Sequence, residues 1–176
     1  MSQLLHALAT GPLTTEYGDF EVTVLYDGLE ECIVLHRGLL RDAEGAYCRL
    51  HSQCFTGHVF HSTECDCDQQ MRSAQESISR LGVGLILLLH QEGKANGAAA
   101  HIASQSLKRT GLSQPAAYLA LGFPADARDY AIATKVLRYF GPRSVRMYTE
   151  DAQKLTAVRS AGVSVEQHAA RTQADA

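Results

Sequence analysis

The chain of 176 residues has no tryptophan, only four prolines and no long run of uncharged apolar residues. The longest apolar run, at 83–89, has the length of a strand and falls far short of the roughly 18 residues that a membrane-spanning helix needs. Residues 1–13 lack the basic start and the long apolar stretch of a secretory signal. These absences predict a cytoplasmic protein that has no membrane partner.

The chain also lacks an excess of either charge. Sixteen lysines and arginines stand against nineteen aspartates and glutamates, which gives a formal net charge of -3. Nucleic-acid-binding domains carry a basic face or stripe, so this balance predicts no nucleic-acid partner, while it allows a small anion held by a few local cations. An apolar fraction of 45% with 20% charged residues excludes intrinsic disorder and predicts a globular domain with a real core.

β-Branched and aromatic residues, punctuated by glycine and aspartate, predict strands at 20–28, 31–38 and 46–52. Further along, helical spacing and apolar runs predict helices at 69–82, 97–109, 126–140 and 151–161, and strands at 83–90, 144–149 and 163–167. The predicted fold class is therefore α/β (α+β), with a mixed β-sheet flanked by helices. We expect a single domain at 1–168 and a frayed tail at 169–176.

Five cysteines are present, and Cys54, Cys65 and Cys67 fall within fourteen residues. In a cytoplasmic protein such clustering favours a metal or catalysis over a disulfide framework. Three cysteine ligands leave the fourth position of a tetrahedral zinc open to water, as in catalytic sites, and zinc brings the pKa of that water close to neutrality. Cys32 and Cys48 lie in apolar, strand-like stretches, which predicts ordinary buried thiols.

The cysteine spacing leaves two other interpretations open. All three cysteines could be buried thiols, or a histidine could complete a closed structural zinc site. Three histidines are near enough in sequence for that, namely His51, His58 and His61. Spacing alone supports a catalytic and a structural zinc about equally.

Other candidates depend on their context. Residues 83–97 predict a strand, a loop and a helix start, an arrangement that offers backbone N–H groups to phosphate. Asp126 and Arg128 are two positions apart and would not share a face of a regular helix, so they can point the same way only from a loop or a first helical turn. The alternatives are a helix N-cap for Asp126, a surface ion pair for Arg128 and a solvated helix position for Lys154.

Four motifs in order resemble those of the GTP cyclohydrolase II family: RLHSQCFTG at 49–57, ECDC at 64–67, HQEG at 90–93 and LGFPADARDY at 121–130. The resemblance implies a homodimeric zinc and magnesium enzyme in the first step of riboflavin synthesis. Its reaction removes C8 of GTP as formate, releases pyrophosphate and leaves a diaminopyrimidine ribosylamino phosphate.

The resemblance also implies a role for each matching residue. Cys54, Cys65 and Cys67 match the zinc ligands. Asp126 matches the proposed acid/base residue, and Arg128 matches the arginine proposed to attack the α-phosphate, so both positions are expected to be catalytic. The positions that match nucleotide contacts are Arg49, His51, Ser52, Gln53, Gln70, Glu92, Gly93, Lys94, Gln114, Thr149 and Lys154.

The chain departs from the family pattern at positions that match catalytic and nucleotide-binding residues or lie beside the matching zinc ligands. Gln105 stands where the family has a tyrosine associated with late ring opening, which makes it an altered catalytic position. Lys94 replaces an arginine and loses the planar fork that contacts phosphate at two points. Glu64 reverses the charge of an arginine beside the metal ligands. The remaining changes are at Gln53, Asp68, Gln114, Glu150 and Asp151.

These departures predict a divergent member with an altered substrate or product. The leading hypothesis is ring opening of a guanine nucleotide, and one variant of it stops at the formylamino product because Gln105 cannot act as a phenol does. A second hypothesis is a cyclohydrolase for another heterocycle or for a nucleotide without the triphosphate. The third is a non-catalytic nucleotide-binding protein whose zinc is structural.

Overall fold

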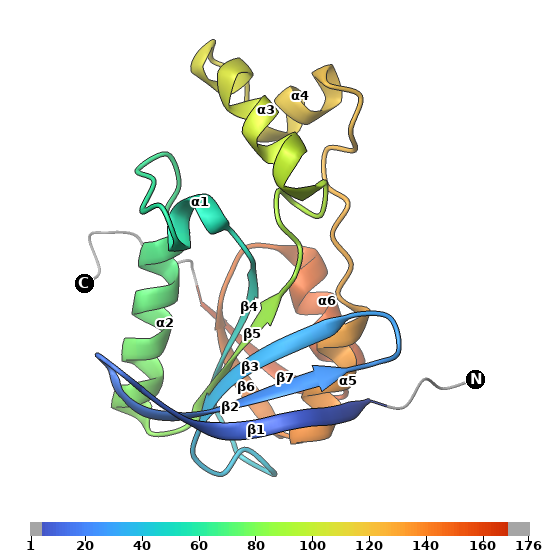
Figure 1. Cartoon of the computed structure of the whole chain (residues 1–176). Coiled ribbons are helices and arrows are strands. Elements are labelled where there is room, and N and C mark those ends of the chain that lie inside the picture. Colours follow the sequence, from blue (N-terminus) through green and yellow to red (C-terminus); the bar gives the residue numbers. More distant parts are fainter. Residues whose placement is uncertain (1–4, 169–176) are drawn as a thin grey trace. The chain divides into compact units, whose positions relative to one another are not determined.

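Seven strands form one mixed sheet in the structure, a computed structural model that describes residues 5–168 (Figure 1). The strands are β1 (His6–Thr15), β2 (Gly18–Tyr26), β3 (Glu31–Arg37), β4 (Ala46–Ser52), β5 (Gly84–Leu89), β6 (Ser144–Tyr148) and β7 (Ser164–His168). Their order is β1-β2-β3-β5-β4-β6-β7. The pairs β1–β2, β2–β3 and β3–β5 are antiparallel, whereas β4–β6 and β6–β7 are parallel.

Six helices accompany the sheet within residues 5–168: α1 (Phe55–His58), α2 (Cys67–Leu81), α3 (Gly97–Arg109), α4 (Gln114–Ala120), α5 (Ala131–Phe140) and α6 (Ala152–Ser160). The predicted fold class, an α/β domain with a mixed sheet and flanking helices, is confirmed. The helix predicted at 126–140 is wrong over its first five positions, because α5 begins at Ala131. The predicted tail at 169–176 lies outside the described residues.

Contacts along the chain define two compact units within this fold, and each is described by itself. Unit 1 comprises the described parts of 1–51, 69–89 and 130–176, which include most of the sheet, α5 and α6. Unit 2 comprises 52–68 and 90–129, which include α1, α3 and α4. None of the helices described between residues 5 and 168 is both long and apolar enough to cross a membrane.

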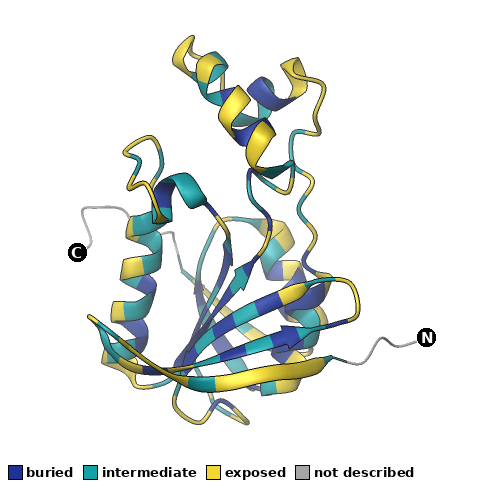
Figure 2. Cartoon of the chain, in the orientation of Figure 1, coloured by how far each residue is buried: buried dark blue, intermediate teal, exposed yellow. Residues whose placement is uncertain are grey.

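The core of unit 1 lies on both faces of its sheet. Helices α5 and α6 cover one face, where Ile132 packs in one cluster with Leu87 of β5. Helix α2 covers the other face, where Ile78 packs with Ile86. Because neighbouring residues of β5 point to opposite faces, this strand is buried almost throughout, as expected of a central strand (Figure 2).

Cys32 in β3 and Cys48 in β4 belong to the larger core cluster and are 0% and 1% exposed. Burial raises the pKa of both thiols to about 12, and the negative charge of Glu30 adds to the effect at Cys32. The prediction that these two cysteines are buried thiols is therefore confirmed. Both remain protonated and unreactive at neutral pH.

Candidate metal centre

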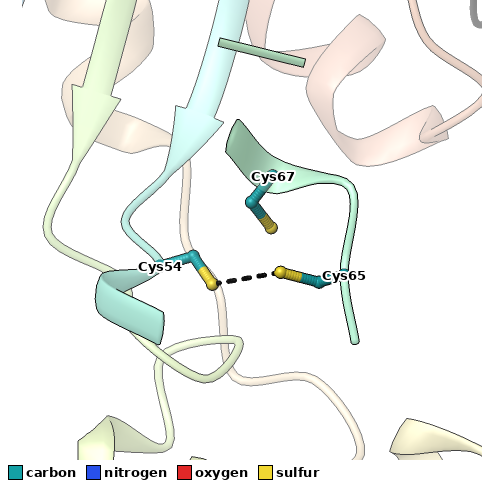
Figure 3. Close-up of side chains that lie close together, drawn as sticks. All are labelled: Cys54, Cys65 and Cys67. Carbon is teal, nitrogen blue, oxygen red and sulfur yellow. Dashed lines mark hydrogen bonds between the residues drawn. The ribbon is translucent and has the colours of Figure 1, made fainter. Parts of the chain in front are cut away.

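The three clustered cysteines converge from separate stretches of unit 2. Cys54 directly precedes α1, Cys65 lies in the following loop, and Cys67 is the first residue of α2. Figure 3 shows their side chains pointing toward one another. The Sγ atoms of Cys54 and Cys65 are 3.7 Å apart, and the three sulfur atoms all lie within 4.8 Å of one another.

This spacing fits a tetrahedral metal. Zinc–sulfur bonds are about 2.3 Å long, so two sulfurs on a tetrahedral zinc lie about 3.8 Å apart. The Cys54–Cys65 distance matches that value and is far longer than the roughly 2.05 Å of a disulfide bond. All three cysteines are free thiols. The donor set therefore fits zinc, with three sulfur ligands from a short segment of chain.

The environment favours a thiolate at Cys54. A hydrogen bond with the Cys67 thiol lowers the pKa of Cys54 to about 4, against the opposing effect of burial. The Thr56 hydroxyl, 3.3 Å from the Cys54 sulfur, and the Gly57 N–H lower it further. The same contact raises the pKa of Cys67, as does its burial. The thiolate is the form of cysteine that binds metal, so Cys54 can bind metal at a pH at which Cys65 and Cys67 still carry their protons.

Gly57 leaves the space that the sulfur atoms occupy. A Cβ atom at this position would lie 3.1 Å from the Cys65 sulfur, 3.1 Å from the Cys67 Cβ and 3.5 Å from the Cys54 sulfur. The two 3.1 Å contacts are tighter than ordinary van der Waals distances, so a side chain here would push against Cys65 and Cys67. Glycine at position 57 is therefore a steric requirement of the cluster.

A carboxylate and an imidazole lie next to Cys54. Glu92, His101 and Cys54 form a second group whose ligand atoms lie within 4.8 Å of one another. One oxygen of Glu92 accepts a hydrogen bond from the Phe55 N–H at 2.8 Å, and the other lies 2.6 Å from His101 Nδ1 and 3.2 Å from the Gly93 nitrogen. Glu92 was predicted to contact nucleotide, yet both of its oxygens are engaged by the chain's own donors.

The histidines considered for a closed zinc site belong to neither ligand group among residues 5–168. His51 is buried in β4, within unit 1, where its Nδ1 is 2.9 Å from Arg49 Nε. The imidazole that does lie near Cys54 is that of His101, which the sequence analysis did not single out. The one available signal was the pattern of α3, where His101 and Ser104 are polar residues on the buried face with Ala100.

Asp126 and Arg128 meet in the loop before α5. Arg128 Nη2 is 2.6 Å from Asp126 Oδ2 and Arg128 Nε is 2.8 Å from Oδ1, a two-point contact. Lys94 Nζ lies 3.4 Å from the same carboxylate. Burial raises the pKa of Asp126, but the hydrogen bonds from Arg128 and the charges of Arg128 and Lys94 outweigh it and lower the pKa to about 2.

This geometry excludes both alternatives that the sequence left open. The N-cap of α5 is Tyr130, so Asp126 is not a helix cap. The Arg128 side chain is only 14% exposed, so the pair is not an ordinary surface ion pair. Both residues lie in a loop, the condition under which they can point the same way. At neutral pH Asp126 is ionised and can accept a proton.

The other predicted residues of unit 2 differ in their surroundings. The Gln114 amide donates to the Ser104 hydroxyl at 2.7 Å. The side-chain oxygens of Gln105 and Ser52 are buried and have no hydrogen-bond partner among the described residues. Gln53 is exposed. Glu64 pairs with Arg109 at 2.6 Å, so the charge reversal beside the metal ligands is balanced within unit 2.

The remaining predicted residues lie in unit 1, and they are described within it. Arg49 of β4 donates hydrogen bonds to His51 and Gln70. Thr149 follows β6, and Lys154 lies in the first turn of α6. The expected extra carboxylate at Asp151 has a structural use, because it caps α6 by accepting hydrogen bonds from the backbone nitrogens of residues 153 and 154.

Comparison with known proteins relates the sequence of the chain to one family. The family model for GTP cyclohydrolase II matches residues 6–170. The GTP cyclohydrolase-2 of Neisseria meningitidis serogroup A is 35% identical over 166 residues, covering 94% of this chain and 84% of that protein. The GTP cyclohydrolase-2 of Acinetobacter baylyi is 36% identical over 161 residues, covering 90% of this chain and 80% of that protein.

Two longer proteins are also similar. The riboflavin biosynthesis protein RibBA of Endomicrobium trichonymphae is 32% identical over 155 residues, which are 87% of this chain and 38% of that protein. The crystal structure of RibBX, a two-domain 3,4-dihydroxy-2-butanone 4-phosphate synthase from A. baumannii, aligns with a TM-score of 0.53 at 15% identity. That alignment covers 97% of this chain and 41% of the other, and it shows a likeness of fold alone.

The replacement Gly57→Ala is expected to weaken zinc binding. The added methyl group would press on the Cys65 sulfur and the Cys67 Cβ, and overpacking of this kind costs about 1–3 kcal/mol, or roughly tenfold in affinity and more. Competition with a chromophoric chelator measures the effect. Gly11→Ala is the matched control, because nothing lies within 4 Å of the Cβ it would add. Equal zinc affinities for the two variants would contradict the steric argument.

The replacement Arg128→Met is expected to raise the pKa of Asp126 from about 2 toward its ordinary value of 3.8. Arg128 supplies the hydrogen bonds that hold the carboxylate in its charged form. The lowered pKa contributes stability above pH 3.8 that is lost as the pH falls through about 2. A carboxyl-carbon NMR titration measures the shift. Arg109→Met, which removes the partner of Glu64, is the control and should leave the pKa of Asp126 unchanged. If Arg128→Met also leaves this pKa unchanged, Arg128 is not the cause of its lowering.

Proposed function

Because the chain belongs to the GTP cyclohydrolase II family, we propose that it is a zinc-dependent hydrolase that opens the imidazole ring of a guanine nucleotide. The observation that carries this proposal is the set of three free thiols, Cys54, Cys65 and Cys67, whose sulfur atoms lie within 4.8 Å of one another, with the Cys54–Cys65 pair at the spacing of a tetrahedral zinc. Zinc held by three sulfur ligands supplies a water of lowered pKa at its fourth position. Three protein ligands favour a catalytic over a structural zinc.

Asp126 is the group that we propose to accept a proton during ring opening. Its pKa of about 2 means that it is ionised at neutral pH, and a positioned carboxylate can act as a general base. It cannot donate a proton first, because Arg128 and Lys94 stabilise its charged form. Its part in the reaction therefore begins with proton uptake.

Arg128 is the residue that we propose to contact the nucleotide phosphates. Its guanidinium already binds a carboxylate at two points in the way that it would bind a phosphate. A phosphate oxygen that reaches Arg128 competes with Asp126 for the same N–H groups. Phosphate binding would then free Asp126 from its strongest partner and bring its pKa closer to the ordinary value.

The product is a diaminopyrimidine ribosylamino phosphate or its formylamino precursor, with pyrophosphate released and, in the complete reaction, formate. Gln105 bears on which of the two forms, because an amide does not exchange a proton as a phenol does. The similarity to a protein named for riboflavin biosynthesis supports a place in that pathway. A homodimer and a bound magnesium ion stay predictions.

One observation favours a second candidate, a nucleotide without the triphosphate as substrate. Lys94 was expected to meet phosphate, but its ammonium group is 3.4 Å from Asp126. A lysine engaged in this way contributes less to the binding of β- and γ-phosphates. If this second candidate is correct, the protein opens the rings of GTP and GMP with similar efficiency.

Zinc-loaded protein is expected to convert GTP into a product with a new ultraviolet spectrum, and Cys54→Ser is expected to lose both zinc and turnover. Cys32→Ala is the matched control, because Cys32 is a core thiol of unit 1 and should keep zinc and activity. Zinc content, pyrophosphate and formate are measured together. Formate release separates complete ring opening from arrest at the formylamino product, and parallel assays with GMP test the second candidate.

Two results would overturn the proposal. One is a protein that holds one zinc and leaves the spectra of GTP, GMP and guanosine unchanged. The other is a Cys54→Ser protein that keeps full turnover, because the proposed chemistry needs that ligand.

A further inference from the structure

We propose that Glu92 and His101 are a positioning pair for the metal centre. In this pair Glu92 fastens the backbone next to Cys54, and His101 holds the Glu92 carboxylate in place. The two side chains and the Cys54 sulfur lie close enough for their ligand atoms to be within 4.8 Å of one another. The inference rests on the proposed zinc site and adds to it two residues that act without binding the metal.

The contact between Glu92 and Phe55 fixes the start of α1. Phe55 follows the zinc ligand Cys54 and is the first residue of α1, so its N–H has no partner inside the helix. Glu92, 37 positions further along the chain, supplies the missing acceptor at 2.8 Å. The backbone that aims Cys54 is therefore held by Glu92.

His101 holds the other end of the same carboxylate. Its Nδ1 lies 2.6 Å from the second oxygen of Glu92, and the two side chains are only 10% and 12% exposed. Hydrogen bonds to a charged group are stronger than neutral ones, and exclusion from water strengthens them further. The His101 ring also meets the Phe55 ring edge-on, with centroids 6.3 Å apart. Both members of the pair thus contact the residue that follows Cys54.

The close approach of Glu92 to α3 depends on Gly93. Its φ of +61° is a left-handed conformation that favours glycine. A Cβ atom here would lie 2.7 Å from the Gly97 carbonyl oxygen and 3.0 Å from the His101 Cβ. The chain can bring Glu92 to His101 only because position 93 has no side chain, so the pair is built into the local backbone.

The hydrogen bonds also argue against direct ligation by Glu92 and by His101 Nδ1, and the cobalt spectra described below test the other ring nitrogen of His101. Both Glu92 oxygens already accept hydrogen bonds from N–H groups, and His101 Nδ1 is engaged with one of them. The three sulfur atoms supply the protein ligands at zinc spacing. Residues that orient metal ligands typically change metal affinity by about 10–100-fold when they are replaced.

The test is a series of His101 variants in the full chain, with zinc affinity measured by chelator competition. An asparagine places an amide N–H where the imidazole Nδ1 lies, so it can still donate to Glu92. We expect His101→Asn to keep an affinity within about threefold of wild type and His101→Leu to lose about 10–100-fold.

Glu92→Gln should lose a similar factor in zinc affinity. The double variant Glu92→Gln/His101→Leu should lose no more than the worse single variant, because the two residues act as one unit. His6→Gln and Glu76→Gln, both at exposed positions, are the controls.

Cobalt substitution and melting of the metal-free protein complete the test. A positioning role predicts that saturating cobalt gives the same d–d and thiolate charge-transfer bands in His101→Leu as in wild type. It also predicts that the metal-free variants melt at the wild-type temperature. A shifted d–d spectrum, with equal losses in the asparagine and leucine variants, would mean that His101 is a ligand and would overturn the inference.

Unchanged zinc affinity in all variants, or losses matched by a lower melting temperature of the metal-free protein, would also overturn it. These results leave the proposed function intact as long as wild type binds one zinc. A wild-type protein that binds no zinc overturns both.

Discussion

Three cysteine sulfur atoms within 4.8 Å of one another are the constraint to which the rest of unit 2 is fitted. Thiolates at this distance repel one another and need a cation among them, so the cluster makes physical sense as a metal site. The neighbouring sequence accommodates it at several points. Gly57 supplies space, Thr56 supplies a hydrogen bond to Cys54, and Glu92 fixes the backbone of the next residue. A short helix and a loop can hold such a cluster because residues distant in sequence support them.

A second charged group lies in the same unit and differs in character. Asp126 is surrounded by the cations of Arg128 and Lys94, so these three side chains satisfy one another without a ligand. A bound phosphate would have to replace a carboxylate in this network. In the proposed reaction, the cost of that exchange would couple substrate binding to the protonation of Asp126. It would also give the lysine at position 94, where the family pattern has arginine, a concrete consequence. Lysine offers a point charge there, whereas arginine would offer a second planar fork.

The sequence predicted the cysteine cluster and most of the elements because both leave local patterns. Cysteine spacing indicated the candidate metal ligands, and apolar periodicity indicated α2, α3 and β5 within a residue or two. No individual strand was predicted at β1, because HALATGPLTT has little strand propensity of its own. It is a strand because it pairs with β2 across the turn at 15–18. The start of α5 was misplaced because the Asp126–Arg128 contact holds those residues in a loop.

The hydrogen bonds by which Glu92 and His101 hold the residue next to Cys54 could not have been predicted from local sequence patterns. Glu92 looked like a nucleotide contact from its motif, and its hydrogen bond to Phe55 joins positions that nothing local connects. His101 carries no motif at all, and only its place on the buried face of a small-residue helix sets it apart. Positions 49, 51, 52 and 54, although close in the first motif, fall in two different compact units. Such facts depend on tertiary structure, which spacing does not encode.

The proposed zinc site has three protein ligands, Cys54, Cys65 and Cys67, and one position for water. X-ray absorption at the zinc edge of the purified, zinc-loaded protein measures this coordination. We expect three sulfur neighbours at about 2.3 Å and one oxygen at about 2.0 Å. A fourth sulfur or a histidine in the coordination sphere, or a protein that retains no zinc, would contradict it.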